Sequence, residues 1–429
     1  MDQPEKMIIY NLFPLLAGRF SEWESHLRRA AEMGFNWVFV NPVHLTGSSG
    51  SLYSVKDYFR INPILVDSDN ANSPEDQAKE ANETAEKLGL RMMVDLVVNH
   101  CAADSGLIRE HPEWFKWEHE GHVEKAFCYE NGNKVVWGDL ARFDYWHSRD
   151  QEGLFLFFLK VVKFLINLGF KGFRCDAAYQ VPDSFWERLI RETRSLFPEV
   201  LFFAETLGCT TAQTKNTAGA GFNYIFNSSK WWDFHSPWLM EQYNLTREIV
   251  PSVSFPESHD TRRLGEEFHG NTNGLKQRYL FSALFSAGVL VPIGFEYGFR
   301  KRFHVVKTRT ADWEETDIDL TSFITKVNRI KESCEIFQIE APTELIDCHN
   351  HNILLMWKGS EDGHGESLII LNKDICNKQH FFTDSLRKFV RQEGVLRDVS
   401  PEYPLEYLPE PFSYDLRPGQ GIVLVTADL

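Results

Sequence analysis

Long apolar runs are missing from this sequence. No stretch of about 18 consecutive apolar residues occurs, so we expect no membrane-spanning helix and no membrane partner. The first residues, MDQPEKMIIYNLFPLLAG, carry no basic segment ahead of a long apolar core and do not predict a secretory signal peptide. We therefore expect a cytoplasmic protein.

Paired cysteines and excess positive charge are missing as well. The seven cysteines are scattered and form no C-x-x-C pair, so the sequence has neither the usual zinc spacing nor an evident disulfide framework. Free thiols fit a reducing compartment. The formal net charge is -16 at pH 7, which argues against nucleic acid as a partner.

Short apolar segments alternate with amphipathic segments through about residue 330. Eight of the apolar segments read as buried strands, and amphipathic segments of helical period lie between them. The predicted strands fall within residues 7–14, 36–42, 91–99, 172–178, 200–205, 221–229, 250–260 and 288–298. Eight strand-helix repeats predict an α/β fold, a closed (β/α)8 TIM barrel. A doubly wound open sheet is the alternative, but no glycine-rich phosphate fingerprint follows any strand.

Two regions depart from this rhythm and predict further domains. Residues 101–149, after the third strand, have no strong periodicity and predict a short inserted domain. From residue 336 to 429, strand-like segments separated by turn residues predict a C-terminal antiparallel β domain, a β-sandwich. The barrel would then comprise residues 1–100 and 150–335.

Acidic residues lie at the ends of several predicted strands. Asp95 lies on the third strand, while Asp176, Glu205 and Asp260 end the fourth, fifth and seventh. The carboxyl ends of barrel strands meet at the face where active sites form. Several carboxylates in one cleft suit glycosidic bond cleavage, with one acting as nucleophile and another as acid.

Arg174 lies two residues before Asp176, on the same face of the strand. For an isolated R-x-D pair, a structural ion pair is the simpler interpretation. With carboxylates at the other strand ends, we interpret Arg174 as the cation that keeps Asp176 ionised and nucleophilic. Glu205 has no adjacent cation in the sequence, so we expect its carboxylate neighbours to keep it protonated as the acid.

The motifs that contain these residues resemble conserved regions of the α-amylase family of glycoside hydrolases, retaining (β/α)8-barrel enzymes. The matching segments, in order, are YSVKDYFRINP (53–63), DLVVNH (95–100), WGDLARFDY (137–145), GFRCDAA (172–178), FAET (203–206) and SHD (258–260). The segments HPEWF (111–115) and CDAAYQVP (175–182) are also similar to the maltosyl-transferring branch of the family. In this family the inserted domain is domain B.

This resemblance implies roles for eight residues. Asp176 would be the nucleophile, Glu205 the acid/base and Asp260 the stabiliser of the transition state. The implied substrate-binding residues are Tyr53, Asp95, His100, Arg174 and His259. Tyr53 would stack on the sugar next to the cleaved bond.

The implied reaction is cleavage of α-1,4-glucosidic bonds of maltooligosaccharides through a covalent glycosyl-aspartate intermediate. We expect a hydrolase, with a glucano- or maltosyltransferase that uses the same intermediate as the alternative. A non-catalytic binding protein is a third class, disfavoured because all three carboxylates are present. We expect an oligosaccharide as the partner.

The sequence also departs from the family pattern. Tyr179 and Gln180 replace a Lys-His pair that often binds leaving-side sugars. The family's calcium site uses residues matching Asn99 and Asp139, but a histidine that often completes it is missing. We therefore expect no cofactor and at most a weak calcium site. The tryptophans of KWWDFHSPW (230–238) are candidates either for sugar platforms or for packing.

Overall fold

The computed structural model describes residues 6–118, 121–130, 133–360 and 365–427. Eight parallel strands close into a barrel in the order β1-β13-β12-β11-β10-β9-β5-β2. Their bounds are β1 Met7–Leu12, β2 Trp37–Val40, β5 Arg91–Leu96, β9 Gly172–Cys175, β10 Leu201–Ala204, β11 Tyr224–Phe226, β12 Ser252–Ser254 and β13 Gly288–Pro292. The predicted (β/α)8 barrel is confirmed.

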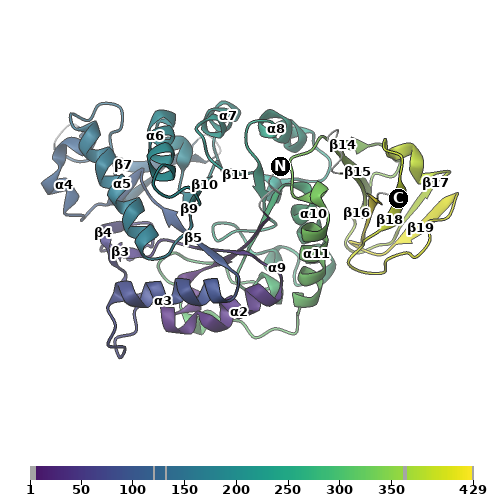
Figure 1. Cartoon of the computed structure of the whole chain (residues 1–429), viewed down its shortest axis with the longest axis horizontal. Coiled ribbons are helices and arrows are strands. Elements are labelled where there is room, and N and C mark those ends of the chain that lie inside the picture. The colour runs from purple at the N-terminus through teal and green to yellow at the C-terminus, as the bar shows by residue number, and fades with distance from the viewer. Residues whose placement is uncertain (1–5, 119–120, 131–132, 361–364, 428–429) are drawn as a thin grey trace.

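Helices pack around the outside of this barrel (Figure 1). The longer ones are α2 Glu24–Glu32, α3 Pro74–Lys87, α5 Gln151–Asn167, α6 Asp183–Arg194, α7 Thr211–Gly219, α8 Trp238–Thr246, α10 Thr272–Phe285 and α11 Thr321–Ser333. Short helices are α1 Pro14–Ala17, α4 Leu107–Glu110 and α9 Leu264–Glu267. The 3-10 turns used below are η4 Ala178–Gln180 and η6 Phe295–Tyr297. No helix in the described ranges is long and apolar enough to cross a lipid bilayer.

Local sequence signals set the helix ends. Ser73 caps α3 by accepting a hydrogen bond from the Asp76 amide at 3.1 Å, with Pro74 at the first helical position. Asp150 caps α5 by accepting from the Gly153 amide at 2.9 Å. Each cap supplies an acceptor for an amide that would otherwise lack a partner at the helix start.

Alternate residues of the barrel strands face two different cores. Met7 and Ile9 of β1 belong to a cluster inside the barrel, together with Trp37 and Phe203. Ile8, between them, belongs to the larger cluster beneath the helices. This alternation follows from the strand period of two. The strands are buried on both faces, so they are almost uniformly apolar.

The inserted segment forms a three-stranded antiparallel sheet in the order β6-β8-β7, with bounds β6 His100–Ala102, β7 Lys125–Glu130 and β8 Asn133–Arg142. A neighbouring pair, β3 His44–Thr46 and β4 Val55–Ile61, lies before the third barrel strand. Neither sheet is apparent as periodicity in the sequence. β8 has exposed apolar side chains at Val136 and Trp137, so its pattern does not mark a buried face.

The C-terminal region forms a five-stranded sheet, β14-β15-β16-β20-β18, and a two-stranded sheet, β17-β19. The bounds are β14 Thr343–Ile346, β15 Ile353–Gly359, β16 Glu366–Asn372, β17 Gln379–Thr383, β18 Val395–Asp398, β19 Phe412–Leu416 and β20 Gly421–Ala427. Leu355 of β15 packs in the core that includes Phe381 and Phe412 of the smaller sheet. Leu354 and Met356 join the barrel-side core instead. Figure 1 shows these sheets at one end of the molecule, beside α10 and α11, with α4 and β7 at the other end.

Two buried lysines bind the carboxyl end of α10. Lys331 of α11 donates hydrogen bonds to the carbonyl oxygens of Ala283 at 2.9 Å and Ser286 at 2.7 Å. Lys358 of β15 donates to the carbonyl oxygen of Phe285 at 2.9 Å. These donors satisfy the last carbonyl groups of the helix. Through Lys358, the larger C-terminal sheet is tied directly to the barrel.

We predict that Lys358→Met lowers the free energy of unfolding by about 1–3 kcal/mol, because the buried Phe285 carbonyl loses its donor. Denaturant unfolding followed by circular dichroism measures the change. Lys87→Met, at an exposed lysine in the last turn of α3, is the matched control and should be close to neutral. Unchanged or increased stability in Lys358→Met would mean that desolvation of the ammonium group outweighs its hydrogen bond.

Candidate active site

Arg174 is the centre of the candidate site. Its side chain is only 4% exposed. Nη1 lies 2.8 Å from Asp95 Oδ1 and 2.7 Å from Asp176 Oδ1, while Nη2 lies 3.2 Å from Glu205 Oε2. One guanidinium group therefore binds carboxylates from the ends of three neighbouring strands, β5, β9 and β10. From the sequence we expect Arg174 to keep Asp176 ionised. In the structure it contacts Glu205 as well.

A second chain of hydrogen bonds leads from Asp95 to Asp260. The Tyr53 hydroxyl donates to Asp95 Oδ2 at 2.6 Å and lies 2.7 Å from His259 Nε2. The same nitrogen lies 2.9 Å from Asp260 Oδ2. Since the tyrosine proton goes to Asp95, His259 Nε2–H is left to donate toward the Tyr53 and Asp260 oxygens. The structure thus joins Asp260 to the group around Arg174.

The ring of Tyr53 also stacks on the ring of His259, with centroids 5.9 Å apart and planes 9° apart. His100 lies behind Tyr53, where its Nε2 donates to the Tyr53 carbonyl oxygen at 3.1 Å. His100 Nδ1 is buried and has no hydrogen-bond partner in the described chain. All eight predicted site residues therefore lie in one connected group, and the role of each stays a prediction.

Glu205 is held by a strained backbone as well as by Arg174. The amide of Ala177 donates to Glu205 Oε2 at 2.7 Å. Ala177 has a φ of 42° and a ψ of 46°, in the left-handed region that residues with a Cβ rarely adopt. This conformation directs the amide that follows Asp176 toward the second carboxylate. It couples the positions of the two groups that would carry out the reaction.

Burial raises the pKa of Glu205 to about 7, and the negative charges of Asp176 and Asp260 act in the same direction. Arg174 and the Ala177 amide oppose this shift without cancelling it. A carboxyl with this pKa can donate a proton and take one back near neutral pH, as a general acid/base must. The raised pKa supports the expectation that Glu205 is protonated. Its largest cause is burial, whereas the sequence analysis expected the neighbouring carboxylates to be the cause.

Asp260 has a different environment. Its side chain is 52% exposed, so it faces the open side of the site. Partial loss of its water raises its pKa, but the charge of His259 and the hydrogen bond from it outweigh this effect and lower the pKa to about 2. Arg302 donates to the Asp260 carbonyl oxygen at 2.6 Å and its charge also lowers this pKa. Asp260 is therefore ionised while Glu205 still holds a proton.

Apolar side chains wall the small pocket between Arg174, Glu205 and Asp260. They come from the interior of the barrel and from the loop after β10, and comprise Phe39, Leu207, Phe226, Phe255 and Leu290. Apolar walls lower the local dielectric, so charges in this pocket interact more strongly than they would in water. These walls contribute to the burial that raises the pKa of Glu205.

Sequence reasoning missed the site contacts of three residues, of which only Gln180 was noted, as a departure from the family pattern. Ala177 gives no signal, because alanine does not indicate a left-handed backbone. Arg302 lies in a basic run, RKRF (300–303), after η6, which would have been a usable signal in so acidic a chain. Gln180 accepts from the Asn99 amide at 3.3 Å and donates to the Phe127 carbonyl at 3.1 Å, linking the barrel to β7 of the inserted sheet.

The tryptophans after β11 divide between the two interpretations. Trp232 is fully buried and packs against Phe234 and Phe281, so it belongs to the core. Trp231 is 53% exposed and meets the ring of Phe255, a wall of the catalytic pocket, edge to face at 6.1 Å. Only Trp231 among this pair has a surface on which a sugar could stack.

The residues matching the family's calcium site fit a cation only in part. Asn99 Oδ1 is buried and has no hydrogen-bond partner among the described residues, as an oxygen ligand would. The Asp139 carbonyl oxygen is already used by the Ala103 amide and the Ser54 hydroxyl. Within the described ranges, no three His, Cys, Asp or Glu side chains converge on a metal-sized site. Calcium prefers six to eight oxygen ligands, so weak binding stays a prediction.

Comparisons with known proteins find enzymes of α-glucan metabolism among the similar sequences. Residues 3–132 match a family model described as the glucanotransferase domain of glycogen debranching enzyme. An alpha-1,4-glucan:maltose-1-phosphate maltosyltransferase of Burkholderia pseudomallei is 25% identical over 74% of this chain and 28% of its own length. The enzyme of that name from Mycolicibacterium smegmatis is 30% identical over 50% of this chain and 31% of its own length. The chain thus spans only about a third of these relatives.

Solved structures extend the likeness to the whole chain at the level of the fold. An α-amylase from Lactobacillus plantarum superposes with a TM-score of 0.76 and 19% identity, covering 98% of this chain and 99% of that one. An Anoxybacillus α-amylase gives a TM-score of 0.79 and 16% identity, covering 99% and 98%.

A closed (β/α)8 barrel with carboxylates gathered around one arginine at the carboxyl ends of its strands defines a glycoside-hydrolase type of enzyme. By sequence the chain is similar to enzymes named maltosyltransferases, and by fold it is similar to α-amylases.

We predict that kcat/KM on a chromogenic α-glucoside falls about tenfold per pH unit above pH 7, because Glu205 then loses its proton. In Arg174→Gln this alkaline limb should move to higher pH, since the charge of Arg174 lowers the pKa of Glu205. The rate should also fall at least about a hundredfold. An alkaline limb at unchanged pH in an active Arg174→Gln variant would contradict the assignment of Glu205 as the acid.

We predict that chelation of calcium lowers the melting temperature by less than about 2 °C, because a weakly bound ion adds little stability. Differential scanning fluorimetry with and without EGTA measures this. A loss of many degrees that added calcium, but not magnesium, restores would show a tight site. Asn99→Ala would then be expected to abolish the effect.

Proposed function

We propose that this chain is a retaining α-glucan transferase, which moves an α-linked glucosyl or maltosyl unit from a donor to a sugar hydroxyl. The observation that carries the chemistry is the shared guanidinium of Arg174, which contacts Asp176 and Glu205 together. This favours a nucleophile and an acid close enough to act on one glycosidic bond. The raised pKa of Glu205 supports its role as the acid, with Asp176 as the nucleophile.

In the first step, an Asp176 oxygen attacks the anomeric carbon while the bond to the leaving oxygen breaks. Glu205 gives its proton to that oxygen. In the second step, the Glu205 carboxylate takes the proton of an acceptor hydroxyl, the acceptor oxygen attacks the same carbon, and Asp176 leaves. Both carboxyls return to their starting states. Asp260, ionised and exposed, would accept hydrogen bonds from the hydroxyls of the reacting sugar.

The choice between transfer and hydrolysis depends on what takes the glycosyl unit. From the sequence alone, hydrolysis is the first expectation and transfer is the alternative. The curated relatives carry the name maltosyltransferase and the matching family model describes a glucanotransferase domain, so transfer is now the better supported alternative. Maltooligosaccharides are the donors that the family resemblance favours.

A phosphorylated donor is a second candidate. The relatives are named for maltose 1-phosphate. In this chain, Arg302 brings a guanidinium group to the backbone of Asp260, beside the open side of the site. A cation there would attract a donor whose leaving group is phosphate. The two donors differ in whether phosphate is released.

The deciding experiment incubates the enzyme with maltoheptaose, alone or with added glucose, and separately with maltose 1-phosphate plus maltooligosaccharide. If the enzyme is a transferase, chains longer than the donor should form with no net gain in reducing ends. If it also uses maltose 1-phosphate as a donor, phosphate should be released in the mixture that contains that compound. One new reducing end per bond cleaved, unaffected by acceptor, would identify a hydrolase.

We predict that Asp176→Asn reduces turnover at least about a thousandfold without unfolding the protein, because the amide is isosteric but a poor nucleophile. Glu205→Gln should retain more activity on an α-glucosyl fluoride than on maltoheptaose, since fluoride leaves without a proton. Circular dichroism controls for folding. Turnover of Asp176→Asn within about tenfold of the parent would mean that another residue is the nucleophile.

A further inference from the structure

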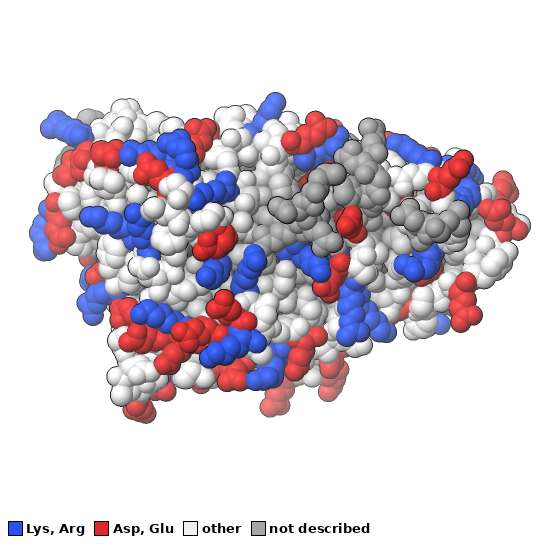
Figure 2. Space-filling view, viewed as in Figure 1, with Lys and Arg blue, Asp and Glu red and all other residues white. Residues whose placement is uncertain are grey.

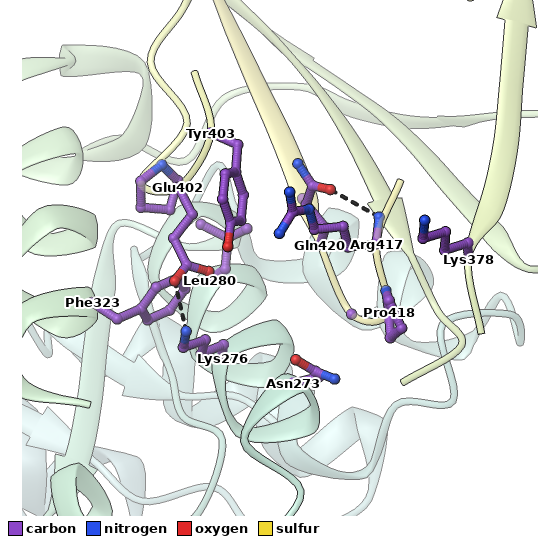
Figure 3. Close-up of a pocket in the computed structure, with 13 residues that line it drawn as sticks. Asn273, Lys276, Leu280, Phe323, Lys378, Glu402, Tyr403, Arg417, Pro418 and Gln420 are labelled. Carbon is purple, nitrogen blue, oxygen red and sulfur yellow. Dashed lines mark hydrogen bonds and ion pairs between the residues drawn. The ribbon is translucent and has the colours of Figure 1, made fainter. Parts of the chain in front are cut away.

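A second pocket lies outside the barrel, where the C-terminal sheets meet α10 and α11 (Figure 3). Its volume is about 510 Å³, within the range of small-molecule sites. Asn273 and Lys276 come from the first turns of α10, and Phe323 from the start of α11. The opposite side is formed by residues 401–403 and by the turn between β19 and β20. No part of this pocket belongs to the catalytic group.

The charges that line this pocket do not balance. Lys276 Nζ pairs with Glu402 Oε1 at 2.6 Å. Arg417 and Lys378 also line the pocket, and within the described part of the chain neither has a carboxylate partner. The pocket therefore has two uncompensated cations in a chain of net charge -16. On the face seen in Figure 2, acidic and basic side chains are interspersed.

Arg417 is held in place by an aromatic ring. Its guanidinium carbon lies 3.8 Å from the centroid of the Tyr403 ring, and Figure 3 shows the side chain reaching toward that ring. Stacking occupies the face of the guanidinium group and leaves its edge N–H groups available to oxygen acceptors. Tyr403 itself has a φ of 52° and is half exposed. A bulky residue in this conformation is strained, so the surrounding structure must fix it.

The floor of the pocket is also preorganised. Gly419, with a φ of 66°, lies so close to α10 that an added Cβ would be 2.6 Å from the Asn273 carbonyl oxygen. The side-chain amides of Asn271 and Asn273 donate to the Ile375 carbonyl oxygen at 3.2 and 3.3 Å. Gln420 accepts from the Arg417 amide at 2.8 Å. These contacts fix the two sides of the pocket relative to each other.

We propose that this junction pocket binds a small phosphorylated ligand, either a sugar phosphate or inorganic phosphate. The phosphate would be held by Arg417 and Lys378, because guanidinium and ammonium groups form the strong charge-assisted hydrogen bonds that phosphate needs. The pocket is larger than phosphate alone requires, and Tyr403, which is half exposed, adds apolar surface of the kind that packs against a sugar ring. This site is independent of the function proposed for the barrel.

Isothermal titration calorimetry and thermal shift with glucose 6-phosphate, inorganic phosphate and maltose test the proposal on the full chain. We expect glucose 6-phosphate to bind and to raise the melting temperature, and maltose to do neither. Arg417→Gln should weaken the binding at least about tenfold. Arg109→Gln, which removes an arginine that is 85% exposed on α4, is the matched control and should leave it unchanged.

The other outcomes are equally informative. Phosphate binding as tight as glucose 6-phosphate would support the shared chemistry and identify free phosphate as the ligand. Binding that is lost in Arg302→Gln but kept in Arg417→Gln would place the ligand at the catalytic mouth and overturn the proposal. No heat and no thermal shift with either phosphate compound up to about 10 mM, or maltose binding that depends on Arg417, would overturn it too.

Discussion

The buried guanidinium of Arg174 is the interaction on which the catalytic face depends. Three carboxylates from separate strands cannot lie this close together in an apolar mouth without a cation among them, since each would have to be protonated or exposed. Arg174 supplies that charge, and its planar geometry fixes where the carboxylates lie. Because Arg174 lies on β9, beside β5 and β10 in the barrel, the register of these strands becomes the geometry of the site.

Glu205 and Asp260, on opposite sides of the site, have different charges near neutral pH. Glu205 is enclosed and retains its proton near neutral pH, while Asp260 is open to solvent and held ionised by His259. The difference does not come from the residue types. It comes from burial on one side and a hydrogen-bonded imidazole on the other, so one barrel mouth has both a proton donor and a fixed negative charge.

The barrel could be predicted from the sequence because its strands are buried on both faces and read as continuous apolar segments. The sheet of the inserted segment could not, because Val136 and Trp137 are exposed and blur any alternation. Most of the site residues, among them Asp176, Glu205 and Asp260, were recognisable from their places at strand ends, whereas Tyr53 was implied only by the family resemblance. Their mutual contacts were not: Tyr53 and His259 are 206 positions apart, and their hydrogen bond depends on barrel closure. The left-handed backbone of Ala177 has no signature in its side chain.

That backbone has a consequence for how the enzyme could change. A left-handed conformation costs an L-residue about 1–2 kcal/mol, whereas glycine would lose about 0.4–1 kcal/mol through the greater freedom of its unfolded chain. Glycine at position 177 would therefore be neutral or slightly stabilising, yet it would let the amide that holds Glu205 move. At position 177, stability of the fold would not favour alanine over glycine, whereas a fixed position of the amide that binds Glu205 would. The alanine found there corresponds to the fixed amide.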